Sequence, residues 1–99
     1  MSSSAECCAE TDFIRDQFAN LAEVQSVHIL FRNNICYITV AVPTKDYALE
    51  DRIYDVQYAI AQELQAQGFL FDVNIVILAG RRLEDIVTSV GQPVLQRAA

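Results

Sequence analysis

Apolar side chains follow a strand-like pattern in three stretches of the chain. In residues 25–32 and 35–42 they alternate with a period of two, which predicts two half-buried β-strands. Asn33-Asn34 separates these stretches, and asparagine tolerates the positive φ of a tight turn, so an antiparallel hairpin is expected. Residues 69–78 are apolar on one face and half apolar on the other, which predicts an interior strand with neighbours on both sides.

Two other stretches place apolar residues three and four positions apart, which predicts helices that bury one face. A first helix is expected from 11 or 12 to 22 or 23, and a longer one over about 47–67. Thr44 or Asp46 can cap the start of the longer helix, and Gly68 can end it. Both helices need an apolar surface to cover, which the strands provide.

These elements predict an α+β domain with the order α-β-β-α-β-α. The last helix is expected over about 82–90, between Gly80 and Gly91, followed by a tail or a last short strand. A single small antiparallel or mixed sheet of three to four strands then carries helices on one face. Residues 1–10, rich in serine, alanine and glutamate, are expected to form a flexible tail, and 11–99 a single α/β domain.

The composition narrows the classes of partner. Thirteen acidic and seven basic side chains give a net charge of −6. Nucleic acids and anionic membranes attract clustered lysine and arginine, so neither is expected as a partner. The longest apolar runs, ITVAV and IVILA, are too short to span a membrane. The opening MSSSAECCAE lacks the basic and apolar regions of a secretory signal, so a cytoplasmic protein is expected.

Residues with reactive side chains are few. His28 is the only histidine and falls in mid-strand, where a place on the sheet surface is expected rather than a catalytic or metal-binding role. Cys7 and Cys8 are adjacent in the expected tail and are interpreted as inert thiols, with metal, redox or lipid chemistry as the alternative. The acidic side of the longer helix is expected to be solvated; it comprises Glu50, Asp51 and Asp55. We therefore expect no catalytic residue, no metal site and no cofactor.

One face of the predicted sheet is apolar but has no predicted helix to cover it. Its members come from all three strands and are Leu30, Tyr37, Thr39, Ala41, Val76 and Leu78. Exposed apolar patches of this kind usually meet a partner, so a non-catalytic protein-interaction or dimerisation module is expected. The partner would be another protein or a second copy of the chain. Alternatively, the C-terminal segment folds across this face and the protein is a monomer.

A different site is predicted at the end of the third strand. Gly80 forms a turn there, and Arg81 and Arg82 can add positive charge to backbone N–H groups that face an anion. Asp72 is an isolated charge within the apolar strand. Together these residues predict, as the alternative function, a contact for a small-molecule or nucleotide ligand in a domain without catalysis.

From Val24 to Leu78 the layout resembles the cytoplasmic domain of cation-diffusion-facilitator metal transporters. In that family a V-x-x-V-H strand, a second strand, an amphipathic helix and a closing strand follow in the same order, as they do here. The resemblance implies a dimerising module. His28 matches one ligand histidine of the family, and the positions of the other ligands are apolar in this chain.

The span from Phe13 to about Gln96 is also similar to a nucleotidyltransferase domain, most clearly in DRIYDVQYAIAQEL followed by FDVNIVIL. This resemblance implies a degenerate member of that family. The region LFRNNICYITV holds neither the family's Gly-Ser turn nor its paired aspartates, and only Asp72 matches a third carboxylate. The expected architecture is accordingly ferredoxin-like or degenerate nucleotidyltransferase-like.

Overall fold

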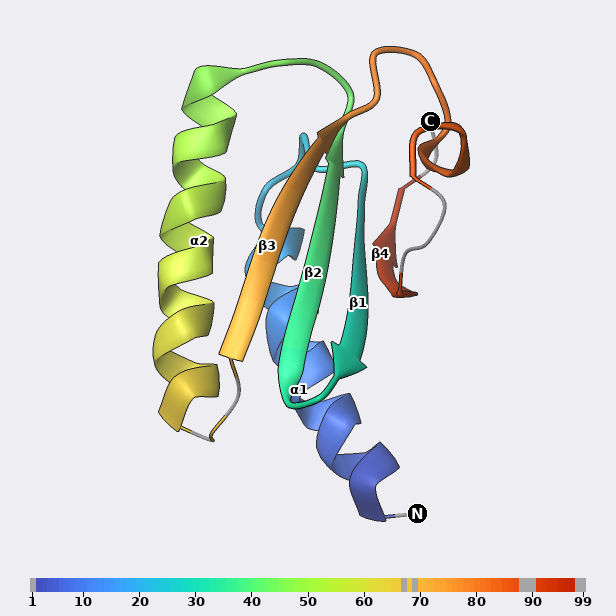
Figure 1. The fold of residues 1–99 in the computed structure, drawn as a ribbon. Helices are drawn as coiled ribbons and strands as arrows, with labels where there is room; N and C mark the ends of the chain where they lie inside the picture. The colour runs from blue at the N-terminus through green and yellow to red at the C-terminus, as the bar shows by residue number, and fades with distance from the viewer. Residues whose placement is uncertain (1, 67, 69, 88–90, 98–99) are drawn as a thin grey trace.

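The computed structural model describes residues 2–66, 68, 70–87 and 91–97, with the backbone alone for residues 2–10 (Figure 1). Its elements are, in order, α1 (Ser2–Ala19), β1 (Ser26–Arg32), β2 (Ile35–Val42), α2 (Tyr47–Ala66), β3 (Leu70–Ile77), the 3-10 turn η1 (Leu83–Asp85) and β4 (Gln92–Gln96). The fold is therefore of the α+β class that the sequence predicts.

The four strands form one mixed sheet in the order β3-β2-β1-β4. β1 is antiparallel to β2 and to β4, whereas β3 runs parallel to β2. Helix α2 connects the two parallel strands, because parallel neighbours need a long crossover. Of the two outcomes expected for the residues after 90, the short strand is the one observed.

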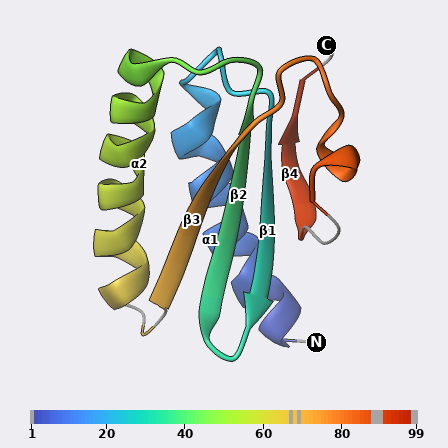
Figure 2. The same ribbon diagram turned by 45° about the horizontal axis from the view of Figure 1, so that its top comes forward.

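Both α-helices cover the same face of the sheet (Figures 1 and 2). α1 packs against β1 and β4, and α2 packs against β3 and α1. Their apolar stripes meet the strands in one core, where each large aliphatic side chain contributes about 1.5–3 kcal/mol. The most deeply buried members are Ile14, Phe18, Val24, Val27, Cys36, Ile38, Val40, Val42, Leu49, Ile53, Ile60 and Leu64. In the described part of the chain, no helix is long and apolar enough to cross a lipid bilayer.

The hairpin between β1 and β2 is confirmed. Asn33 and Asn34 have φ angles of 53° and 64°, the left-handed conformation that a two-residue hairpin turn requires. Arg32 pairs with Ile35 directly across the turn. This register sets which side chains of the two strands share a face.

The ends of α2 are also formed by the predicted residues. Oδ1 of Asp46 accepts hydrogen bonds from the N–H groups of Ala48 (3.0 Å) and Leu49 (3.2 Å), so Asp46 is the N-cap. Gly68 has a φ of +90°, and its N–H donates to the Gln65 carbonyl at 3.0 Å. The helix is therefore fixed at both ends by local sequence.

Two predicted boundaries need correction. α1 begins at Ser2, so the backbone of residues 2–10 is helical where a tail was expected. The stretch contains no glycine or proline, and its alanine and glutamate residues favour helix. The helix expected over 82–90 is only the 3-10 turn η1 in the described residues, with 88–90 outside them. Arg82 precedes that turn in an extended conformation and makes no side-chain cap, so a longer helix has no start signal.

The prediction that the third strand lies inside the sheet is wrong, because β3 is an edge strand. Its core-facing residues Phe71, Val73, Ile75 and Ile77 pack against the core as expected, and residue 69 lies outside the described part. The apolar character of its other face is explained by the path of the chain after β3, which is described below.

Candidate functional site

The sheet face turned away from α1 and α2, called the outer face below, is buried at one end and open at the other. Strand register arranges its side chains in three rows across β1, β2 and β3: Ser26–Ala41–Val76, His28–Thr39–Asn74 and Leu30–Tyr37–Asp72. The first row is only 8%, 0% and 7% exposed. In the second row His28 alone is buried, and in the third row no residue is.

The six residues predicted to form an open apolar face are thus divided. Ala41 and Val76 are buried, whereas Leu30, Tyr37, Thr39 and Leu78 are half-buried. A wide apolar surface across the whole face is not present, because the chain itself covers one end.

Residues 78–87, called the crossing segment below, provide this cover. The chain leaves β3 at one edge of the sheet, passes the ends of β2 and β1, and descends beside β4 (Figures 1 and 2). Between this segment and the sheet lies a groove of about 760 Å³. Ser26 and His28 of β1 line it together with Leu78, Leu83 and Val87 of the crossing segment.

His28 is a buried polar member of the groove, with 7% of its surface exposed. Its Nε2 atom lies 3.3 Å from Oγ of Ser26. Burial lowers the pKa of His28, and the backbone of Gly91 opposes this shift in part. The imidazole is therefore neutral at pH 7 and offers one donor and one acceptor. His28 lies on the outer face as expected, but its expected exposure is corrected, because the crossing segment lies opposite it across the groove.

Arg81 of the crossing segment and Arg97, the residue after β4, also line the groove. Nε of Arg81 donates to the Leu78 carbonyl at 3.2 Å, which holds the side chain against its own turn. A terminal nitrogen of Arg97 donates to the Ala19 carbonyl at 2.9 Å. The first bond leaves further N–H donors of Arg81 for a ligand. The second directs the guanidinium group of Arg97 toward the end of α1.

Arg82 and Asp72 are placed differently from the prediction. Arg82 lines the groove, but it is highly exposed and lies 3.6 Å from Glu84 and 3.4 Å from Asp85. Asp72 lies near the start of β3, and six residues of strand, roughly 20 Å, separate it from Leu78. The structure therefore does not bring Asp72 together with Arg81 and Arg82.

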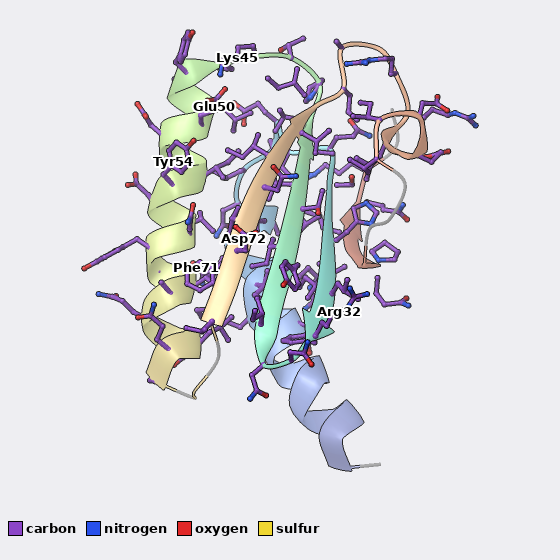
Figure 3. All side chains as sticks on the ribbon, viewed as in Figure 1. Arg32, Lys45, Glu50, Tyr54, Phe71 and Asp72 are labelled. Atoms are coloured by element: carbon purple, nitrogen blue, oxygen red, sulfur yellow. The ribbon has the colours of Figure 1, made fainter. Side chains whose placement is uncertain are left out.

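Asp72 instead borders a smaller hollow of about 430 Å³ at the open end of the outer face. Leu30, Arg32, Tyr37 and Asn74 line the same hollow. Figure 3 shows Asp72 on β3 and Arg32 at the end of β1. Because its charged residues are exposed, we interpret this hollow as a solvated surface feature.

The second prominent surface is the free edge of β3. The N–H groups of Leu70 and Leu78 donate to Asn34 and Val42, at 3.1 Å and 2.8 Å, and so point toward the β2 side. Strand geometry alternates, so the N–H groups of the odd-numbered residues between them point away from β2. These residues are Phe71, Val73, Ile75 and Ile77. The edge presents a row of backbone groups without a strand partner in the described fold.

The core is also open along this edge. The four core-facing side chains of β3 are half-buried, whereas their neighbours Cys36, Ile38, Val40 and Val42 on β2 are fully buried. At the start of the strand, Leu70 is 63% exposed. β3 therefore exposes both backbone and apolar side chains that β2 does not.

Helix α2 extends this surface. Arg52 lies 2.8 Å from Glu23, so the side of α2 that carries Arg52 faces the end of α1. Tyr54 lies on the other side and is 53% exposed, and Figure 3 shows it on the same flank as Phe71. At the start of the helix, Lys45 lies 2.9 Å from Glu50, a hydrogen-bonded pair that raises the pKa of Lys45 (Figure 3). The flank thus combines an aromatic ring with the apolar edge of the sheet.

The described side chains of these two surfaces include no metal-binding cluster. Among the side chains described, which begin at residue 11, no three His, Cys, Asp or Glu residues gather around one point. The side chains of Cys7 and Cys8 lie outside that part.

Sequence reasoning found one side of the groove and missed the other. The sequence predicts Arg81 and Arg82 as ligand contacts and Leu78 as part of an open apolar face, and all three line the groove. It does not predict His28 or Arg97 as binding residues. His28 and Arg97 reach the groove only because β4 pairs with β1, a contact between distant parts of the chain. No local motif carries that information.

The chain matches no known protein-family model, and no curated protein matches its sequence significantly. In the described residues, the fold is a small α+β domain with a mixed four-stranded sheet, a groove beside the crossing segment and a free edge at β3. Its function is therefore argued from these two surfaces.

Proposed function

We propose that this domain is a non-catalytic interaction module that forms a homodimer by pairing β3 with β3 of a second copy. The observation that supports the proposal is the free edge of β3, with its outward N–H groups and its half-buried apolar side chains. Pairing would satisfy those backbone groups and remove the side chains from water, and both changes favour association.

The two edges of the sheet differ in how well they resist pairing. Natural sheets protect free edges with short strands, proline, charge or irregular register. β4 has five residues, contains Pro93, and pairs with a register shift at β1. β3 has eight residues, no proline and a single charge, Asp72. The difference favours β3 as the binding edge.

A second copy is a suitable occupant because the edge is complementary to itself. Antiparallel pairing centred on Asn74 places Asp72 opposite Val76 of the other copy, so no like charges meet within the strand pair. It also places Phe71 opposite Ile77 and continues the core-facing apolar row across both copies. A two-fold axis through Asn74 generates this contact twice.

The proposal includes a cytoplasmic location and no nucleic-acid or membrane partner. The net charge of −6 disfavours anionic polymers and surfaces. An odd number of cysteines, three, is unlike the disulfide frameworks of small secreted domains.

The test compares the mass of the wild type with that of Val73→Lys, by size-exclusion chromatography with light scattering. We expect a wild-type dimer and a monomeric variant, because pairing would bury the added ammonium group without a partner. Gln62→Lys adds the same charge at an exposed position of α2 and should leave the dimer intact. Circular dichroism of each variant checks the fold.

A second variant addresses the backbone directly. Ile75→Pro removes an N–H group that points away from β2, so it should block pairing while keeping the bonds between β2 and β3. A wild type that stays monomeric at high concentration would refute the proposal. So would a dimer that Leu30→Asp dissociates and Val73→Lys does not, because the interface would then lie on the outer face.

A further inference from the structure

We propose that the groove beneath the crossing segment binds a small organic anion with an apolar body, such as a monocarboxylate. The groove lies on the outer face, away from the β3 edge, so this site is independent of the proposed dimer. Its volume of about 760 Å³ is within the range of about 300–1,000 Å³ typical of small-molecule sites.

The distribution of charged residues around the groove favours a negatively charged ligand. The protein carries a net charge of −6, yet three of its seven basic residues, Arg81, Arg82 and Arg97, line this one groove. Glu84 is the single acidic side chain among the lining residues, and Arg82 is the arginine nearest to it. The guanidinium group of Arg97 is bonded to α1. Arg81 forms no ion pair among the described residues and keeps further N–H groups for a ligand. A carboxylate can accept two parallel N–H bonds from such a guanidinium group.

The other residues that line the groove favour a ligand with an apolar portion. Leu78, Leu83 and Val87 line the groove from the crossing segment, and Pro43 adds another apolar side chain. A ligand of charge alone, such as inorganic phosphate, would leave these side chains in contact with water. An acid with an alkyl or aryl portion would cover them while its charged end meets an arginine.

Ser26 and His28 give the groove a polar position on the β1 side. Both are more than nine-tenths buried, and the Ser26 hydroxyl and the His28 Nε2 atom are 3.3 Å apart. A neutral imidazole and a hydroxyl can each donate or accept a hydrogen bond. They would therefore orient a ligand without adding charge to it.

The test uses octanoate and 1-octanol, which share an alkyl chain and differ in charge, with inorganic phosphate as the third probe. Binding is measured by titration calorimetry and by amide chemical shifts in two-dimensional NMR. We expect octanoate to bind at least about tenfold more tightly than either other probe, the scale of one charge-assisted hydrogen bond. The shifts should involve Ser26, His28 and the crossing segment.

Arginine variants test whether the preference for octanoate comes from the groove. Arg81→Gln combined with Arg82→Gln should weaken octanoate binding about tenfold or more and leave 1-octanol unaffected. Arg32→Gln removes an arginine outside the groove and should not change the affinity. Equal affinity for octanoate and octanol, equal affinity for phosphate, or shifts confined to the β3 edge would each overturn the proposal. The mass of the protein is recorded in the same samples, so that a failure of dimerisation is seen separately.

Discussion

A single buried imidazole couples the stability of this domain to pH. Burial holds the pKa of His28 in the folded protein below its ordinary value of 6.5. The unfolded chain therefore binds a proton more readily than the folded protein between these two values. The stabilising contribution of neutral His28 is present above pH 6.5 and is lost as the pH falls through the folded pKa. Burial is the larger cause of this pKa shift, and the backbone of Gly91 opposes it in part.

His28→Gln tests this dependence. The free energy of unfolding of the wild type should fall between pH 7 and about pH 5.5, with a slope of at most about 1.4 kcal/mol per pH unit from this one group. The variant should lack that part of the slope, because glutamine does not titrate. Urea unfolding at a series of pH values measures both curves, and parallel curves would contradict the assignment. Carboxylates common to both proteins cancel in the difference.

Among the elements, those specified by neighbouring residues were predictable from the sequence. The hairpin depends on Asn33 and Asn34, and α2 on the cap at Asp46 and the glycine at 68. The position of β3 was not predictable, since a strand is apolar on two faces either in the middle of a sheet or under a covering segment. Val76 of this edge strand is only 7% exposed, and the periodic pattern cannot separate the two causes.

The candidate site was also predictable only where it depends on neighbouring residues. The turn and the arginines at the end of β3 were found from local sequence, but the opposite side of the groove comes from β1 and from the residue after β4. The register of β4 against β1 decides that contact. A strand of five residues that includes Pro93 gives too weak a pattern to predict its partner.

The pairing of β4 depends on Gly91 in particular. A Cβ atom at this position would overlap the carbonyl group of Ile29 and the nitrogen of Leu30. Because these are backbone atoms, they cannot rotate away. Gly91→Ala should therefore displace β4 from β1, with a loss of roughly 3 kcal/mol or more in unfolding free energy, at the upper end for point mutants.

Gly80→Ala is the matched comparison. Gly80 has a φ of +84°, and a Cβ atom at this position would meet no neighbouring atom within 4 Å, so alanine there introduces strain but no overlap. Its cost should be about 1–2 kcal/mol. Chemical denaturation measures both values, and equal losses for the two variants would show that close packing at Gly91 is not decisive.

At the scale of the whole molecule, net charge opposes the proposed dimer. Two copies each carry a charge of −6, and their repulsion acts over distances comparable to the Debye length. Raising the salt concentration from about 0.05 M to about 0.3 M shortens that length and should lower the dimer Kd several-fold. Sedimentation velocity measures the shift. Dissociation by salt would instead mean that ion pairs between copies hold the dimer.

Because the β3 amides alternate in direction, their hydrogen exchange rates show whether a partner strand has bound at this edge. In a free monomer, deuterium should enter quickly at Phe71, Val73 and Ile75, while the intervening amides, bonded to β2, exchange slowly. Strand addition at this edge would protect the fast set alone, residue by alternate residue. A contact through α2 or the outer face would leave the alternation of fast and slow exchange along β3 unchanged. The exchange pattern therefore identifies the surface through which the copies associate as well as the association itself.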